Sequence, residues 1–405
     1  MSPIVLAFAA SIAGAALTSL GVWRTWQFFR AKRGGRPSSP FAPMEARPAS
    51  ASRPDGSTPL VSILKPVCGL DDGLEENLRS FLALEDVRYE VIVSVADDDD
   101  PALPIVRRVM NQAPAGLFRL IVGGGGAARN RKVERLIAAM QVAAGSLILV
   151  SDSNVRATPR FLADTLDAFS DPEAGCISNP FTAAETISAG ARIEGIHLLT
   201  FVLTGNVLAS WVGATCVVGK SMMLRRTVLE RIGGFDAFRD VLAEDQAIGL
   251  AVARAGYRIA LAPVLVRNVT TRRTVRAAVE RQIRWNRIRF SFSPLLYSCE
   301  FLVNPAPLGI VTSAALVGAG VITPWAAVAA SASFVVLRMI QAMILAAASG
   351  VRLGLQDLAL VPIQDGLQFA AQFAPWISRE IQWRGRRARL GPGTLILDEP
   401  ESAAA

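Results

Sequence analysis

The distribution of apolar residues divides the chain into two kinds of segment. A run from Pro3 to Trp23 holds no charge, and the block from Phe301 to Gly350 holds only one charged side chain, Arg338. About 20 apolar residues in a helix match the roughly 30 Å hydrocarbon core of a bilayer. The first run therefore predicts a transmembrane anchor at residues 1–24, and the second block predicts two spanning helices within residues 301–350.

A Pro-Trp pair interrupts the second block near its middle, so its two spans are expected at roughly 306–323 and 326–348. Arg338 inside a span is costly unless it faces protein or water. Residues 353–378 mix Leu, Phe and Trp with Asp and Gln, which is too polar for a span. We therefore expect an interfacial or re-entrant helix and a basic cytosolic tail in residues 351–405.

Basic residues follow the first apolar run and do not precede it: Arg24, Arg30, Lys32 and Arg33. This placement favours an uncleaved anchor over a signal peptide and puts the chain after Arg24 in the cytosol. The net charge of +8 suits anionic lipid headgroups better than nucleic acid, because many positive charges flank apolar segments. We expect a multi-pass membrane protein without a nucleic-acid partner, and the Ala- and Arg-rich composition favours a bacterial inner membrane.

Short apolar runs alternate with helical patterns between the two apolar blocks. The runs are Leu60–Leu64, Tyr89–Val95, Phe118–Val122 and Leu147–Val150, and the helical patterns include 74–84 and 132–142. This alternation predicts an α/β fold with a mostly parallel sheet covered by helices, in a cytosolic domain at residues 59–295. Residues 25–58 contain a stretch rich in Pro, Ser, Ala and Gly and predict a flexible linker.

Acidic residues follow two of the expected strands. Asp97–Asp100 come after the strand that ends at Val95, and Ser151-Asp152-Ser153-Asn154 come after the strand that ends at Val150. Ligands of such sheets bind beyond the carboxyl ends of the strands, where Asp152 could hold a divalent cation that also grips a diphosphate. The alternative for each run is a solvated turn with a helix cap.

Two further motifs lie later in the chain. Ala243-Glu244-Asp245 directly precedes a helical pattern and could supply a base or merely cap the helix. In Arg281-Gln282-Ile283-Arg284-Trp285, two arginines share a helical face beside an aromatic ring. Guanidinium groups suit phosphate oxygens, but a basic interfacial helix is an equally simple interpretation of this motif alone.

Several other classes of site are disfavoured. Gly219-Lys220-Ser221 ends like a P-loop, but five residues separate Gly213 from Gly219 where the motif needs four. Gly123 to Gly126 lacks the dinucleotide-binding spacing. Four scattered cysteines and the single His197 form no disulfide framework or zinc motif.

Taken in order, the acidic turn, Asp152, Asp245 and the RQIRW stretch resemble the D, D, D, (Q/R)xxRW signature of ceramide glucosyltransferases and their bacterial relatives. The surrounding blocks VSILKPVCGLDDGLEENLRSF, YEVIVSVADDDDPA and GGFDAFRDVLAEDQAIG are similar to that family as well. The resemblance covers about residues 60 to 290. It implies a GT-A fold, a UDP-sugar donor and a divalent cation, Mg²⁺ or Mn²⁺.

The resemblance also implies roles on the donor side of the site. Asp97 would contact the nucleoside, with Lys65-Pro66 in a nearby nucleotide-binding loop, although any aspartate of the acidic turn could take this role. Asn130 and Lys132 would lie near the diphosphate. Asp152 would bind the metal together with donor oxygens and water, because Asn154 stands where a full DxD motif has a second carboxylate.

The remaining implied roles concern catalysis. Asp245 would take the proton from the acceptor hydroxyl as it attacks the anomeric carbon from the face opposite the leaving UDP. Arg281, Arg284 and Trp285 would close over the diphosphate and stabilise its developing charge.

The resulting hypothesis is an inverting membrane glycosyltransferase that moves a sugar, glucose by preference, from UDP to a membrane lipid, ceramide by preference. Transfer of N-acetylglucosamine to a hopanoid polyol is an open alternative. Processive polysaccharide synthesis is disfavoured by the small number of spans. A non-catalytic membrane scaffold, in which the acids only cap helices, is the alternative from another functional class.

Overall fold

The computed structural model describes residues 2–33, 60–124, 126, 128–383 and 386–397. Contacts divide the chain into two compact units. The sheet unit comprises Ser38–Glu185 and Ala209–Thr271, and the helical unit comprises Met1–Pro37, Thr186–Leu208 and Arg272–Ala405. Most of the expected linker, residues 34–58, lies outside the described residues.

The sheet unit is built on a seven-stranded sheet with the order β3-β2-β1-β4-β8-β6-β9. Its strands are β1 (Val61–Pro66), β2 (Tyr89–Val95), β3 (Phe118–Val122), β4 (Leu147–Val150), β6 (Ala174–Ser178), β8 (Met222–Arg225) and β9 (Arg258–Leu261). β1 pairs in parallel with β2 and β4, and β2 pairs in parallel with β3, whereas β8 runs antiparallel to its neighbours β4 and β6. The expected α/β fold with a mostly parallel sheet is confirmed, and the carboxyl ends of β1, β2 and β4 share one edge.

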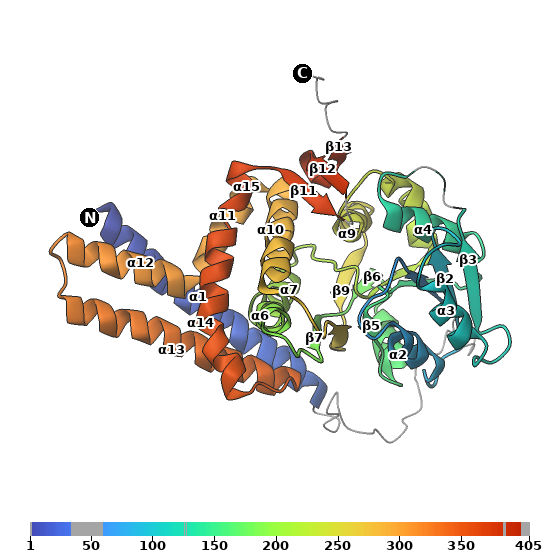
Figure 1. Ribbon diagram of the computed structural model, residues 1–405, viewed down its shortest axis with the longest axis horizontal. Coiled ribbons are helices and arrows are strands. Elements are labelled where there is room, and N and C mark those ends of the chain that lie inside the picture. Colours follow the sequence, from blue (N-terminus) through green and yellow to red (C-terminus); the bar gives the residue numbers. More distant parts are fainter. Residues whose placement is uncertain (1, 34–59, 125, 127, 384–385, 398–405) are drawn as a thin grey trace. The chain divides into compact units, whose positions relative to one another are not determined.

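Helices and a smaller sheet complete this unit (Figure 1). The helices are α2 (Leu74–Arg79), α3 (Leu103–Met110), α4 (Arg131–Met140), α5 (Phe161–Leu166), α8 (Arg226–Arg231) and α9 (Glu244–Arg254), with 3-10 turns at Ser80–Leu82, Asp167–Ser170 and Phe235–Phe238. A three-stranded sheet joins β5 (Val155–Arg156), β10 (Val266–Val269) and β7 (Phe181–Ala184).

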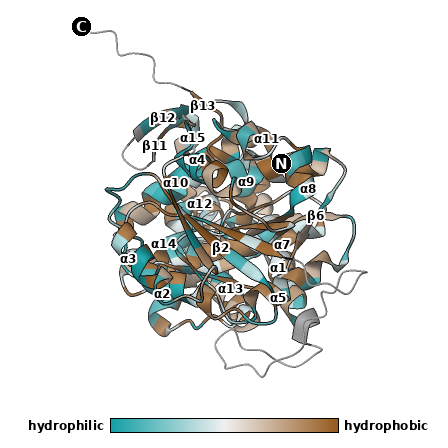
Figure 2. Cartoon of the chain, turned by 90° about the vertical axis from the view of Figure 1, so that its right-hand side faces the viewer, coloured by the Kyte–Doolittle hydropathy of each residue, from teal (hydrophilic) through white to brown (hydrophobic). Residues whose placement is uncertain are grey.

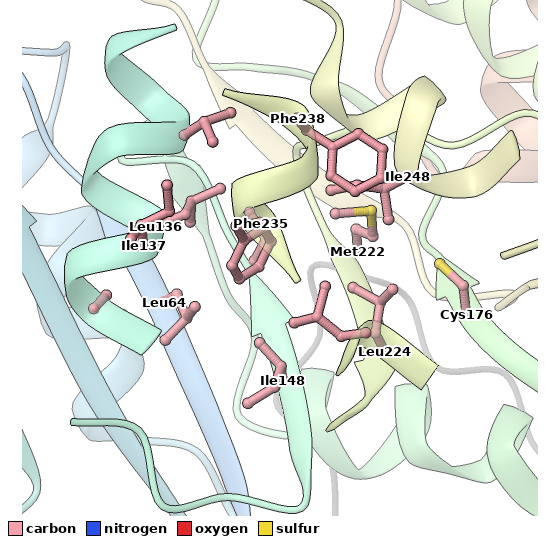
Figure 3. Packing of buried hydrophobic residues seen from close by; sticks show 14 of the residues in the cluster. Leu64, Leu136, Ile137, Ile148, Cys176, Met222, Leu224, Phe235, Phe238 and Ile248 are labelled. Atoms are coloured by element: carbon pink, nitrogen blue, oxygen red, sulfur yellow. The ribbon is translucent and has the colours of Figure 1, made fainter. Parts of the chain in front are cut away.

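The core of the sheet unit explains why the strands read as unbroken apolar runs. All six residues of β1 are buried, as expected for a parallel strand covered on both faces. Helix α4 places Val133, Leu136 and Ile137 at helical spacing against the sheet, and Figure 3 shows these last two beside Leu64 and Ile148. Burial of each such side chain contributes roughly 1.5–3 kcal/mol to the free energy of unfolding. Figure 2 shows the mostly hydrophobic colour of β2 and the mixed hydrophilic and hydrophobic colours of α2 and α3.

The helical unit contains most of the long helices. They are α1 (Pro3–Arg33), α6 (Ala189–His197), which a π-helical turn (Leu198–Val202) joins to α7 (Leu203–Trp211), α10 (Val275–Phe292), α11 (Pro294–Cys299), α12 (Pro305–Gly318), α13 (Pro324–Ser349), α14 (Leu355–Ala371) and α15 (Ala374–Ile377). Two 3-10 turns, Glu300–Val303 and Pro392–Thr394, and a small sheet of β11 (Glu380–Trp383), β12 (Arg386–Leu390) and β13 (Ile396–Leu397) complete it.

Three helical stretches among the described residues are long and apolar enough to cross a membrane: Pro3–Arg30, Ala189–Trp211 and Pro324–Ser349. A pair of helical stretches with a 76° bend between them, Pro294–Val303 and Pro305–Gly318, passes the same test when taken together, as a broken span or a re-entrant loop. The apolar pattern of the sequence does not predict the stretch at 189–211, because Arg192, Glu194 and His197 interrupt it. The expected polar segment after Gly350 forms helix α14.

Arg338 on α13 does face protein. Its guanidinium donates to both carboxylate oxygens of Asp365 on α14, at 2.8 and 3.0 Å, and to Gln341 at 2.8 Å. Arg338 is 3% exposed and Asp365 4%. A buried arginine in this apolar unit is thus paired in a bidentate arrangement, which offsets its cost of desolvation.

Candidate functional site in the sheet unit

Strands β1 and β4 bring the first candidate residues together. Lys65, near the end of β1, donates from Nζ to Ser151 Oγ at 3.2 Å and to the carbonyl oxygen of Asp152 at 3.0 Å. The ammonium also lies 3.8 Å from the centre of the Phe81 ring. Burial lowers the pKa of Lys65 to about 7, against the opposing effect of the nearby Asp152 carboxylate. Lys65 therefore ties the β1 end to the loop that carries Asp152.

Asp152 itself lies between two lysines. Lys132 on α4 approaches Oδ1 at 2.8 Å, and Lys220, just before β8, approaches Oδ2 at 2.9 Å. Lys220 also donates to Asn154 Oδ1 at 2.8 Å. The Asp152 side chain is still 23% exposed, so the cluster is open to a ligand from solvent.

Ion pairs outweigh burial in setting the pKa values of Asp152 and Lys132. Burial alone would raise the pKa of Asp152, but the ammonium groups of Lys132 and Lys220 outweigh it and hold the pKa well below its usual range. Burial likewise opposes the charge on Lys132, and Asp152 and Glu244 outweigh it and raise that pKa. Asp152 and Lys132 are therefore both ionised at neutral pH.

Asn130 and Glu244 connect α4 to the start of α9. The Asn130 side chain caps α4 by accepting from the amides of Lys132 and Val133, and its Nδ2 donates to Val241 O at 2.7 Å. Glu244 Oε1 lies 2.7 Å from Lys132 Nζ and forms an ion pair with it. Burial raises the pKa of Glu244 in spite of that ammonium, and neighbouring carboxylates add to the effect. Through its hydrogen bonds to the α4 amides and to Val241 O, Asn130 fixes the position of Lys132.

Asp245, the expected base, follows Glu244 on α9. Its Oδ2 accepts from the amide of Gly219 at 2.6 Å and its Oδ1 from the amide of Gln246 at 2.8 Å. A Cβ at Gly219 would lie 2.7 Å from Lys132 Nζ and 3.1 Å from Asp245 Oδ2. Only a residue without a side chain fits there unchanged, so Gly219 lets the lysine cluster and the Asp245 carboxylate approach one another.

The acidic turn after β2 separates into two parts. Asp100 is buried, and its carboxylate accepts from the amides of Gly69, at 3.0 and 3.1 Å, and of Ala102, at 2.9 Å. Asp100 therefore caps the loop after β1 and not the start of α3, whose N-cap is Ala102. Asp97, Asp98 and Asp99 are exposed. The nucleoside contact expected of Asp97 stays a prediction.

The RQIRW stretch lies on α10 in the helical unit. Arg281 donates to Glu194 Oε1 on α6 at 2.7 Å, and Arg273 pairs with the other oxygen of Glu194 at 2.5 Å. The Arg281 guanidinium also stacks over the Trp285 ring, 4.6 Å from its centre. The expected approach of Arg281, Arg284 and Trp285 to a donor diphosphate stays a prediction, because they belong to a different unit from Asp152 and Asp245.

The fit of a divalent cation can be judged from the side chains at Asp152. Among the described residues, no group of three or more His, Cys, Asp and Glu side chains could hold a metal ion. Both Asp152 oxygens are ion-paired with lysines, and Asn154 contributes an amide oxygen that Lys220 already contacts. These residues could serve as single ligands of an ion carried by the donor phosphates, but they do not form a metal site of their own.

Sequence patterns do not single out two members of the cluster. Lys220 lies in a segment that only resembles a P-loop, and Glu244 lies in a motif that also fits a simple helix start. A useful signal was the composition, because the chain has only four lysines among 42 basic residues and three of them, Lys65, Lys132 and Lys220, meet here. Their convergence required the tertiary fold.

Known proteins are similar to this chain in sequence and fold. Residues 6–396 match the profile of glycosyl transferase family 21. Ceramide glucosyltransferase 3 from Caenorhabditis elegans is 27% identical over 267 residues, which cover 65% of this chain and 57% of that protein. An N-acetylglucosaminyltransferase from Rhizobium meliloti is 24% identical over 286 residues, covering 67% of this chain and 63% of that protein. The matched regions thus span about six tenths of these relatives.

A solved structure shares the fold. The mannosyltransferase PcManGT from Pyrobaculum calidifontis, in complex with GDP-Man and Mn²⁺, aligns with a TM-score of 0.52 and 21% identity, over 92% of this chain and 99% of that one. The mixed sheet with its covering helices is therefore a GT-A fold, as expected from the sequence. Because the family profile matches nearly the whole chain, this protein belongs to glycosyl transferase family 21.

Proposed function

We propose that this glycosyltransferase moves a hexose, glucose by preference, from a UDP-sugar to the hydroxyl of a membrane lipid, ceramide by preference. The observation that carries the proposal is the cluster of Lys132, Asp152, Lys220 and Glu244 at the carboxyl ends of the strands, next to Asp245. The named ceramide glucosyltransferase relatives support the lipid acceptor. The apolar helices support a bilayer location, which we propose to be a bacterial inner membrane with the sheet unit in the cytosol.

In the proposed reaction, the Asp245 carboxylate accepts the proton of the acceptor hydroxyl. The hydroxyl oxygen forms a bond to the anomeric carbon while the bond from that carbon to the diphosphate oxygen breaks, so the configuration inverts and UDP leaves. The main-chain amides of Gly219 and Gln246 orient the Asp245 carboxylate. Arg281 and Arg284, with Trp285, are proposed to stabilise the diphosphate, with Asp97, Lys65-Pro66 and Asn130 on the nucleotide side.

A bound Mg²⁺ or Mn²⁺ would supply further positive charge to the leaving diphosphate, with Asp152 as its ligand from the protein. Lys132 already holds a fixed ammonium beside Asp152 and can neutralise part of the same charge.

Transfer of N-acetylglucosamine to a hopanoid polyol is a second proposal. The relative from Rhizobium meliloti, named as an N-acetylglucosaminyltransferase, favours that donor sugar. The two proposals share the catalytic residues and differ in the pocket for the sugar and the lipid.

The test uses the detergent-purified full chain with UDP-glucose, UDP-N-acetylglucosamine or UDP-glucuronate, ceramide or a hopanoid polyol, and Mg²⁺ or Mn²⁺. Mass spectrometry should detect a glycolipid from one donor and one acceptor. Asp245→Asn should lower the rate by about 10²- to 10⁴-fold, because it removes the base. Asp236→Asn, at an exposed position of the same unit, is the matched control and should keep the activity. Equal rates for Asp245→Asn and the native chain would contradict the assigned base, and no product from any pair would contradict the proposed function.

A further inference from the structure

The lysines of this chain are concentrated in one place. Of its 42 basic residues only four are lysines, so 38 are arginines. Lys65, Lys132 and Lys220 all contact Asp152, through its carbonyl oxygen, Oδ1 and Oδ2, at 3.0, 2.8 and 2.9 Å. A chain that otherwise uses arginine almost throughout has lysine at each of these three positions.

The space around Asp152 explains why lysine suits it. An ammonium is a compact point charge on a flexible stem, whereas a guanidinium is a broad, rigid fork. Lys132 Nζ lies where even a methyl group on Gly219 would come within 2.7 Å of it. Lys220 is 8% exposed and is enclosed by Asp152 and Asn154. The space around Asp152 therefore suits the compact ammonium groups of lysines, which can shift when the lysine side chains rotate.

The charges of the cluster balance before any donor arrives. Lys132 and Lys220 neutralise Asp152, and Lys132 also contacts Glu244. A bound diphosphate adds negative charge that must be neutralised in a partly buried place. The ammonium groups of Lys132 and Lys220 already contact the two carboxylate oxygens of Asp152. A metal ion would otherwise have to bind at these oxygens.

We propose that Lys220 is a donor-binding residue whose ammonium, together with that of Lys132, contacts the diphosphate and supplies positive charge that a divalent cation would otherwise bring. Nucleotide binding by this chain then tolerates the removal of divalent cations. The inference rests on the proposed function, because it assumes that a nucleotide diphosphate binds beside Asp152.

The test measures the binding of UDP to the detergent-purified full chain by isothermal titration calorimetry, in excess EDTA and in Mn²⁺, with GDP as a second probe. The native chain should bind in EDTA with an affinity within about tenfold of that in Mn²⁺. Lys220→Met should weaken binding in EDTA by about 10- to 100-fold, the usual range for a lost charge-assisted hydrogen bond. Mn²⁺ should restore most of the loss, because the variant frees Asp152 Oδ2 for a metal ion.

The matched control is Arg254→Met, which removes one positive charge from an exposed position at the end of α9 and should change neither affinity. If the native chain loses its affinity for UDP in EDTA, the inference is overturned. This outcome does not depend on whether the variant can be purified in a folded state. Equal affinities of the native chain and Lys220→Met in EDTA would overturn it too. Failure of the folded native chain to bind UDP or GDP, even with Mn²⁺, would instead contradict the proposed function and remove the basis of the inference.

Discussion

At the scale of single residues, the site depends on ionisable side chains held under unusual burial. Lys65 has no exposed surface, yet it keeps its amine beside the Asp152 carbonyl and over the Phe81 ring. The Lys65 side chain is fully buried in the folded chain, whereas water surrounds it in the unfolded chain. The folded protein therefore holds the Lys65 proton less tightly than the unfolded protein does.

This difference predicts a pH dependence of stability. The pKa of Lys65 falls from 10.5 to about 7 on folding, so between these values the unfolded state binds more protons and stability rises with pH. The free energy of unfolding of the native chain, minus that of Lys65→Met, should increase by about 1.4 kcal/mol per pH unit between pH 7 and 9. Denaturation followed by tryptophan fluorescence measures it, and other titrating groups largely cancel in the difference. A difference that stays constant over this range would mean that Lys65 keeps an ordinary pKa.

At the scale of elements, polar residues join the helices of the helical unit. Glu194 on α6 holds Arg281 on α10, and Asp365 on α14 holds Arg338 on α13. The first contact links helices that are distant in sequence, and the second joins two consecutive helices. An apolar surrounding makes each pair costly to break, since the remaining charge would have no compensation.

The Arg338 and Asp365 pair allows a direct test of this idea. Arg338→Met should destabilise the protein by about 3–5 kcal/mol, because it leaves the Asp365 carboxylate buried and unpaired. Arg338→Met combined with Asp365→Met should recover most of that loss, since no uncompensated charge remains. Thermal unfolding of the detergent-purified variants measures both changes. A double variant as unstable as Arg338→Met alone would show that the pair matters for packing and not for charge.

At the scale of the whole molecule, apolar and charged segments are distributed differently between the two units of the chain. The helical unit carries the apolar stretches, whereas the sheet unit carries the acidic and lysine residues of the candidate site. The proposed transfer from a water-soluble donor to a lipid acceptor requires such a division. The basic residues that follow the first span, such as Arg24 and Arg30, favour a cytosolic sheet unit.

This arrangement predicts the outcome of membrane fractionation. The protein should remain in the membrane pellet after alkaline carbonate extraction, because its spans are held by the hydrophobic effect and not by charge. Protease should digest the sheet unit in inside-out bacterial membrane vesicles and spare it in right-side-out vesicles. An antibody against a sheet-unit epitope measures this difference. Digestion only in right-side-out vesicles would reverse the proposed topology.

Local patterns in the sequence determined the elements that depend on local chemistry. Unbroken apolar runs predicted β1 to β4, and the length of uncharged segments predicted the candidate spans that begin at Pro3 and Pro324. The span expected at 306–323 is instead part of the bent pair. The resemblance of the ordered acidic and basic motifs to a known family also predicted the family and implied the GT-A fold.

Tertiary structure alone decided which of these residues meet. Lys220 and Asp152 are 68 positions apart, and only the antiparallel pairing of β8 with β4 places their side chains together. The same applies to Arg338 and Asp365, and to the assignment of Asp100 as a cap for the loop after β1. Sequence patterns record the neighbours of each residue along the chain, whereas ion pairing depends on neighbours in space, which the packing of the whole fold creates.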